Sequence, residues 1–155
     1  MYIYEPKLNM LTTKAIRGAG MNKFNVSPDK GIIGLVYKSH KGITSLYPSN
    51  DPRFDPSLDN YRKSSTRNII CVPLKTGNNC IGCIEMSNRM HGEYTEEDFN
   101  LLSCIAKQLA IGLVTHKHKE VTKAVNDDTI ANNNLLTPLL KNVLIILAEM
   151  LKSEK

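Results

Sequence analysis

Two apolar runs joined by a short turn constrain the fold of this chain more than any other feature. Residues 69–74 and 80–87 are rich in Ile, Val, Leu and Cys, and Thr76-Gly77-Asn78-Asn79 lies between them. A Gly-Asn turn between apolar runs is typical of a β-hairpin, so the two runs are predicted to pair as antiparallel strands. Pro73 predicts that the first of these strands ends close to it.

Further short strands and a short helix are predicted before this hairpin. The residues of the short helix are 31–38, opened by Gly31 and closed near Gly42. Residues 48–56 are rich in Pro, Asp and Asn, and are predicted to hold neither helix nor strand. Alternating or β-branched runs predict the other strands, which are residues 2–4, 10–16, 23–26 and 43–47. Because hairpins follow one another, the pattern predicts an α+β fold with an antiparallel sheet and helices packed on a face.

The longest helical pattern follows a capping-box-like start at Thr95-Glu96-Glu97-Asp98. Apolar residues then recur at steps of three and four, which predicts an amphipathic helix over residues 95–118. Residues 119–135 are predicted to form a polar linker, and residues 136–155 a C-terminal linker or dimerisation helix. The apolar seam of that last helix would consist of Leu140, Val143, Leu147 and Met150. The helix is predicted either to fold back on the sheet or to pair with a second copy.

Composition excludes several classes of protein. The 155 residues are 41% hydrophobic and carry a net charge of +5 from scattered Lys and Arg, which is typical of one globular domain without a nucleic-acid-binding stripe. The longest near-apolar run, residues 143–148, is too short to span a membrane. Met1 is followed by Tyr2-Ile3-Tyr4-Glu5 rather than by a signal peptide, which predicts a cytoplasmic protein with reduced thiols.

The cysteines and histidines are interpreted as structural. Cys80 and Cys83 have CxxC spacing, but the two-residue period of a strand predicts that they point to opposite faces, so neither a zinc site nor a redox pair is expected. His116 and His118 diverge on the long helix, and the other two histidines lie in predicted loops. The sequence therefore predicts no metal site, no cofactor and no catalytic residues within this chain.

Five stretches of the sequence occur together, and in this order, in one known family. They are GIIGLV at 31–36, DPRF at 51–54, TRNIICVPL at 66–74, IGCIEMSNR at 81–89 and YTEED at 94–98. Together they resemble a GAF domain, most closely the GAF domains of cyclic-nucleotide phosphodiesterases and related cyclases. The resemblance covers residues 1–118. It implies about six antiparallel strands with helices on one face, and a pocket on the other face closed by the middle loop and short helix. It also implies that the usual N-terminal helix is missing here.

The resemblance implies a pocket for cAMP or cGMP. The family's ligand-contacting positions fall on Ile32, Ile33, Asp59, Thr66 and Glu85. The backbone amides of Ile32 and Ile33, at the start of the short helix, suit a cyclic phosphate. Glu85 shares a predicted strand face with Ile81 and Cys83, and is expected either to contact ligand or to have a Lys, amide or water partner. The polar loop around Asp59 favours a solvated turn residue over a ligand contact, and Thr66 fits a cap at a strand entrance equally well.

Other positions depart from the family pattern. Ile16 and Arg17 stand where cyclic-nucleotide binders have an aromatic residue and an acid, which favours an alternative, a ligand-free GAF domain acting as a dimerisation or scaffold module. Arg89 and Asp98 fall on a family signature pair and are expected to form a structural salt bridge between the last strand and the long helix.

The residues thus predict a regulatory module and not an enzyme. The sequence has no His-Asp metal cluster like that of a phosphodiesterase catalytic domain, and its cysteines do not match those of the pigment-binding or sulfoxide-reducing relatives. Any catalysis would belong to a larger signalling protein, such as a phosphodiesterase. The expected partners are a cyclic nucleotide and a second copy of the chain, paired through helices, with no nucleic acid or membrane.

Overall fold

The structure, a computed structural model, describes residues 1–17, 23–59, 66–126 and 143. The N-terminal strands are β1 (Tyr2–Glu5), β2 (Met10–Thr13) and β3 (Asn25–Val26), and helix α1 (Gly31–Ser39) follows them. The middle of the chain holds β4 (Ile43–Ser45), the 3-10 helix η1 (Pro48–Asn50) and the short helix α2 (Pro56–Asp59). The hairpin strands β5 (Ile69–Thr76) and β6 (Asn79–Ser87) precede the long helix α3 (Glu96–Asn126).

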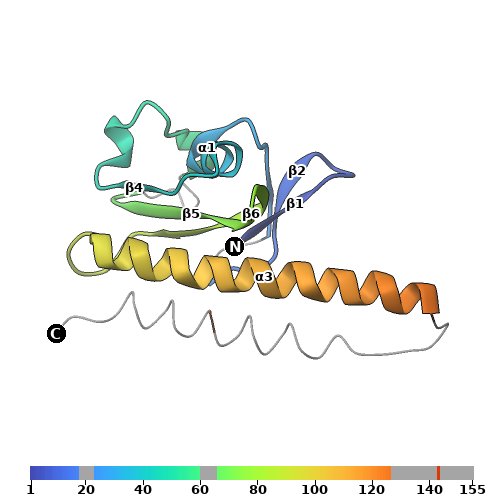
Figure 1. Ribbon diagram of the computed structural model, residues 1–155. Coiled ribbons are helices and arrows are strands. Elements are labelled where there is room, and N and C mark those ends of the chain that lie inside the picture. Colours follow the sequence, from blue (N-terminus) through green and yellow to red (C-terminus); the bar gives the residue numbers. More distant parts are fainter. Residues whose placement is uncertain (18–22, 60–65, 127–142, 144–155) are drawn as a thin grey trace.

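The predicted α+β fold is confirmed. Six strands form one sheet in the order β3-β2-β1-β6-β5-β4, and every neighbouring pair is antiparallel. Figure 1 shows α3 running across one face of this sheet and α1 lying over the other. The sheet is therefore the middle layer of three.

Each face of the sheet has its own apolar cluster. The α3-side cluster joins the sheet to the long helix and consists of Ile70, Val72, Leu74, Ile84, Met86, Tyr94, Leu102, Ala106, Leu109 and Ala110. The α1-side cluster joins the sheet to the short helix and consists of Tyr2, Leu11, Val26, Ile32, Ile33, Val36, Ile69, Cys71 and Cys83. Since successive strand residues point to opposite faces, β5 and β6 each contribute to both clusters.

The hairpin pairs from Ile69↔Ser87 to Thr76↔Asn79. The prediction that the first strand ends at Pro73 is wrong, because β5 continues to Thr76. β4 pairs with β5 only as far as Cys71, so the missing N–H of Pro73 removes no hydrogen bond to β4.

A bulge in β6 changes which side chains share a face. The β5–β6 register shifts between Leu74 and Lys75, which leaves Ile81 as the extra residue. Ile81 therefore packs against the α3-side cluster, whereas Cys83 belongs to the α1-side cluster. The prediction that Glu85 shares a face with Ile81 is wrong for this reason.

The segment between β4 and β5 contains more structure than predicted. Residues 48–56 include η1, and α2 begins at Pro56. The carboxylate of Asp55 starts α2 because it accepts hydrogen bonds from the backbone N–H and the hydroxyl of Ser57, at 2.9 and 2.6 Å. Phe54 and Leu58 pack against the α1-side cluster, which holds the segment on that face of the sheet.

Helix α3 begins where predicted and ends later. Thr95 caps its first turn, but the helix runs to Asn126 instead of residue 118, so the start of the predicted 119–135 linker is helical. The rest of the linker and the predicted helix over 136–155 lie outside the described residues, apart from Val143. The side chain of Val143 packs against the α3-side cluster.

Candidate functional site

The first turn of α1 lies directly on the sheet. Ile32 and Ile33 are completely buried in the α1-side cluster. A Cβ atom on Gly34 would lie 2.8 Å from the carbonyl oxygen of Pro28, so glycine permits this close approach to the preceding loop. Lys30 precedes the helix in an extended conformation and makes no side-chain capping bond in the described structure. The first turn, residues 31–34, contains no acidic side chain, so its positive end suits an anion.

Glu85 introduces a carboxylate on the same side of the sheet. It pairs with Cys71 across the β5–β6 ladder, and paired residues share a face. Cys71 belongs to the α1-side cluster, so the half-buried Glu85 also points to the α1 side. A carboxylate on a largely apolar face requires polar contacts, and the structure gives Glu85 such an interaction.

The thiols beneath α1 are buried and unreactive. Burial raises the pKa of Cys71 well above its ordinary value, and a hydrogen bond with Cys83 raises it further. The Cys83 thiol in turn donates to the carbonyl oxygen of Ile33, with a sulfur–oxygen distance of 3.7 Å. These thiols are free and link the sheet to α1. The environment of Cys71 favours its protonated form, which is not the nucleophile.

The prediction that Cys80 and Cys83 point to opposite faces is wrong. The Ile81 bulge adds a residue between them, and Cys80 pairs with Lys75 of β5. Lys75 lies four residues from Cys71 and so shares its face, which places Cys80 on the α1 side together with Cys83. Burial also raises the pKa of Cys80, whose thiol donates to the carbonyl oxygen of Gly82 at 3.2 Å.

The other two predicted ligand contacts, Thr66 and Asp59, lie between β4 and β5. Thr66 is 6% exposed and precedes β5, whose first ladder pair is Ile69↔Ser87. It therefore lies near the end of β6 that carries Glu85. Asp59 is the last residue of α2, not a loop residue as predicted. The structure thus brings Ile32, Ile33 and Glu85 to one side of the sheet, and sets Thr66 and Asp59 on segments that border it.

Arg89 and Asp98 form an ion pair between the end of β6 and the first turn of α3. The Arg89 side chain is only 7% exposed, and the Asp98 side chain 16%. The guanidinium also donates to the carbonyl oxygen of Glu93 at 3.1 Å and lies 6.0 Å from the centre of the Tyr94 ring.

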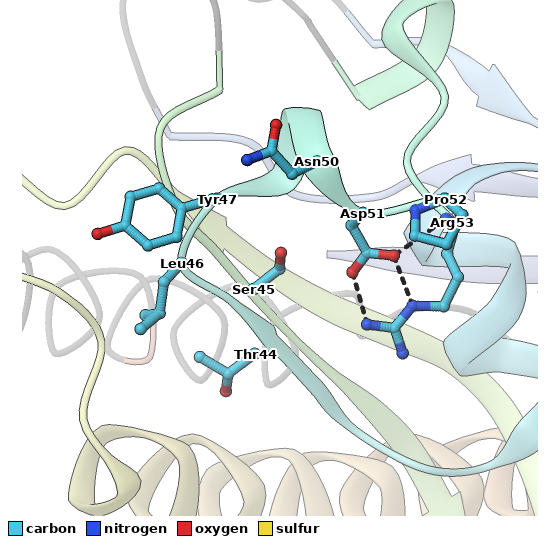
Figure 2. A pocket seen from close by; sticks show the side chains of 8 residues that line it. All are labelled: Thr44, Ser45, Leu46, Tyr47, Asn50, Asp51, Pro52 and Arg53. Carbon is cyan, nitrogen blue, oxygen red and sulfur yellow. Dashed lines mark hydrogen bonds and ion pairs between the residues drawn. The ribbon is translucent and has the colours of Figure 1, made fainter.

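A cavity of about 550 Å³ lies beside β4, and sequence reasoning did not find it. Figure 2 shows Tyr47 on one side of it, the Asp51–Arg53 pair on the other and Ser45 between them. Its lining residues are Thr44, Ser45, Leu46, Tyr47, Asn50, Asp51, Pro52 and Arg53. The DPRF motif carried the only signal for it, and that motif was read as a family marker.

The charged pair of this cavity is held firmly. Arg53 donates from Nε to Asp51 Oδ1 at 2.7 Å and from Nη2 to Oδ2 at 2.5 Å. These hydrogen bonds from Arg53 hold the pKa of Asp51 below its usual value, and a hydrogen bond from Ser45 contributes. The Asp51 side chain is 8% exposed and that of Arg53 is 48% exposed, so the guanidinium faces solvent.

Within residues 1–17, 23–59 and 66–126, no group of three His, Cys, Asp or Glu side chains could hold a metal ion. No helix of the described part of the chain is long and apolar enough to cross a membrane.

The comparisons with known proteins agree with this fold. Residues 9–113 match the GAF domain family, and the chain therefore belongs to that family. A probable 3',5'-cyclic phosphodiesterase of Caenorhabditis elegans is 26% identical over 104 residues, which are 67% of this chain. The match covers only 14% of that much longer relative.

Solved structures show the same fold at low sequence identity. The GAF domain of a phosphoenolpyruvate-protein phosphotransferase from Coxiella burnetii has a TM-score of 0.66 and 17% identity, with 77% of this chain and 73% of that chain covered. A type II free methionine-R-sulfoxide reductase from Thermoplasma acidophilum has a TM-score of 0.60 and 21% identity, with 70% and 72% covered. The same architecture therefore occurs in a GAF domain of a phosphotransferase and in a methionine sulfoxide reductase.

Proposed function

We propose that this chain is a regulatory GAF domain that binds a cyclic nucleotide within a larger cytoplasmic signalling protein, such as a cyclic-nucleotide phosphodiesterase. The proposed ligand contacts are Ile32, Ile33, Asp59, Thr66 and Glu85. The observation that carries the proposal is Glu85, a half-buried carboxylate on the side of the sheet that α1 covers. Carboxylates are rare on such a face unless a polar group meets them.

The chemistry of a cyclic nucleotide matches these groups. Its cyclic phosphate is a monoanion, which the positive end of α1 attracts at the first-turn amides of Ile32 and Ile33. Its sugar and base carry hydroxyl and N–H groups, and the carboxylates of Glu85 and Asp59 would accept hydrogen bonds from them. The Thr66 hydroxyl can both donate and accept hydrogen bonds. Burial raises the pKa of the Cys71 thiol and so disfavours its thiolate, which supports binding in preference to catalysis.

The similarity to a probable cyclic phosphodiesterase supports the same proposal, since it extends over 67% of the chain. Ile16 and Arg17 weigh against selective reading of a purine. An aliphatic residue still covers a base, but Arg17 cannot accept hydrogen bonds. We therefore propose binding of the cyclic phosphate and sugar, and leave cAMP and cGMP as the two ligands to compare.

Isothermal titration with cAMP and with cGMP tests the proposal. We expect saturable heat with at least one of them, and at least tenfold weaker binding for Glu85→Gln and for Thr66→Val. Glu97→Gln is the matched control, because Glu97 is an exposed carboxylate on α3, across the sheet from Glu85. An absence of heat with both nucleotides, in a chain with folded circular dichroism, would overturn the proposal.

The second candidate function is dimerisation through α3. Leu101 and Ile111 of α3 are 48% and 44% exposed, although the opposite face of this helix packs against the α3-side cluster. With Cys104 and Gln108, which are also exposed, they occupy one stripe at heptad-like spacing. A second copy of the chain would cover this stripe.

Light scattering of the wild type and of the Leu101→Glu, Ile111→Glu double variant tests the second candidate. We expect the wild-type mass to rise towards that of a dimer with concentration, and the double variant to stay monomeric. A wild-type mass that stays at 17.3 kDa across the whole concentration range would exclude this function.

A further inference from the structure

The end of β6 is tied to the segment that enters β5 by backbone and side-chain bonds. Asn88 adopts a left-handed conformation with φ 59°, which asparagine tolerates better than most residues. Its N–H donates to the carbonyl oxygen of Asn68 at 2.9 Å. Its side-chain Oδ1 accepts from the backbone N–H of Arg67 at 2.7 Å. Asn88 is therefore hydrogen-bonded to Arg67, the residue that follows Thr66.

Arg89 continues this connection into the loop before α3. Its backbone N–H donates to Oδ1 of the buried Asn68 at 2.9 Å, and its carbonyl oxygen accepts from Nη2 of Arg67 at 3.1 Å. Nδ2 of Asn68 reaches the carbonyl oxygen of Gly92 at 3.4 Å. Two side chains of the β5 entrance thus hold the backbone that carries the Arg89 guanidinium.

The connection ends on the oxygen that caps α3. Oδ2 of Asp98 accepts from the Arg89 guanidinium, and from the backbone N–H and hydroxyl of Thr95 at 2.8 and 3.0 Å. In return, the Asp98 N–H donates to the Thr95 hydroxyl at 3.2 Å. The ion pair with Arg89 and the cap of α3 therefore share one acceptor oxygen, which couples the position of Arg89 to the cap.

We propose that Asn88 and Arg89 are positioning residues that transmit the state of the proposed ligand contact Thr66 to the first turn of α3. This Asn88–Arg89 link deepens the proposed function and rests on it for the identity of the ligand. Thr66 is buried and adjoins Arg67, so a ligand that fixes Thr66 also fixes the donor to Asn88. The first turn of α3 then has two states, capped with Arg89 in place, or frayed with Arg89 displaced.

Hydrogen exchange of residues 95–101 tests the link in the full chain. Asn88→Gly removes the Oδ1 acceptor and keeps the left-handed backbone accessible. Asn9→Gly is a matched control, since Asn9 also has a positive φ of 50° and its Oδ1 accepts one hydrogen bond, from the Tyr4 hydroxyl in the β1–β2 turn. Asn88→Asp retains an acceptor oxygen and should rescue the effect.

The first comparison measures hydrogen exchange without nucleotide. We expect Asn88→Gly to speed exchange of the Asp98 and Phe99 amides by about three- to tenfold, Asn9→Gly to leave them unchanged, and Asn88→Asp to restore most of the protection. Equal exchange of these two amides in Asn88→Gly and wild type would overturn the link. If Asn88→Gly does not fold, the exposed Arg67→Ala serves instead, because it deletes only the bond to the Arg89 carbonyl oxygen.

The ligand arm separates this inference from the proposed function. With saturating cAMP or cGMP, the wild type should gain protection at residues 95–101, whereas Asn88→Gly should bind with a Kd within about threefold of wild type and lose that gain. Full retention of the gain in Asn88→Gly would contradict transmission. If the wild type binds neither nucleotide, the proposed function fails, and the ligand-free arm still decides whether the link exists.

Discussion

The two faces of the sheet differ in what they bury. The α3-side cluster is built from aliphatic side chains and one tyrosine, and it lies under a helix of 31 residues. The α1-side cluster lies under a helix of nine residues, includes two thiols, and is bordered by the stacked rings of Tyr4 and Tyr37 and by the carboxylate of Glu85.

This difference separates stability from function. The largely apolar α3 side offers few groups that could recognise a ligand, and its burial stabilises the sheet. The α1 side retains polar groups whose burial costs free energy unless they find partners. The strands that connect both faces, β5 and β6, can therefore carry a change on the α1 side to the start of α3.

Gly82→Ala should break both faces and give the largest effect. A Cβ atom at Gly82 would lie 2.0 Å from the carbonyl oxygen of Tyr2 and 3.0 Å from the Cα of Ile3, so β1 would have to separate from β6. Because backbone cannot move as a side chain does, we expect a loss of at least about 4 kcal/mol in the free energy of unfolding. Urea denaturation measures it.

The matched control for Gly82→Ala is Gly112→Ala on α3. A Cβ atom there meets nothing within 4 Å, so alanine should stabilise the chain by about 0.5–1 kcal/mol through helix propensity. Unchanged stability of Gly82→Ala would show that β1 does not pair with β6 at this position.

Leu102→Ala and Ile33→Ala compare the two faces directly, because both side chains are fully buried. We expect Leu102→Ala to cost about 3 kcal/mol and Ile33→Ala about 2 kcal/mol. The short α1 can settle into part of the space left by Ile33, whereas α3 is fixed along its length. Chemical denaturation of both variants measures the difference, and a larger cost for Ile33→Ala would reverse the assignment of stability to the α3 side.

Features of the fold could be predicted from the sequence where residues close together in the chain determine them. The hairpin and the start of α3 are encoded locally, by the Gly77-Asn78 turn and by the Thr95–Asp98 capping box, and both are present. The Ile81 bulge leaves no local signal, because the extra residue is defined only against β5. An assumed regular period therefore placed Cys80 on the wrong face.

The candidate site was less accessible to sequence reasoning than the fold. The α2 helix includes Leu58, which packs against the distant α1-side cluster. The cavity is lined by residues within 44–53, but its shape depends on the path of a turn-rich segment that periodicity does not describe. Residues 115–120 are all polar, which interrupts the apolar pattern and predicts a helix end, whereas α3 continues through them to Asn126.

Tyr94→Phe should stabilise the chain, because it removes a polar group from the α3-side cluster. Tyr94 is 6% exposed, and among the described residues its hydroxyl has no hydrogen-bond partner. Removing a buried hydroxyl of this kind should raise the free energy of unfolding by about 1 kcal/mol. Thermal and urea denaturation measure the gain, and Tyr47→Phe, at an exposed position, is the control. A destabilised Tyr94→Phe would show that the hydroxyl has a partner after all.

Asp51→Asn should give the smallest effect, and only at acidic pH. The hydrogen bonds from Arg53 lower the pKa of Asp51 in the folded chain, so near pH 4 the unfolded chain binds more protons. The stabilisation is therefore complete above the unfolded value and is lost as pH falls through the lower folded value. Since Arg53 faces solvent, we expect this stabilisation to amount to less than about 1 kcal/mol.

Urea denaturation at pH 6 and pH 3 measures the free energy of unfolding. Between these two pH values, Asp51→Asn should lose less of it than wild type does. Asp29→Asn, which removes a carboxylate from the exposed pair with Lys38, is the control. An equal loss in wild type and Asp51→Asn would mean that the Asp51–Arg53 pair contributes no pH-dependent stability. The polar character that distinguishes the α1 side would then rest on Glu85 and the buried thiols.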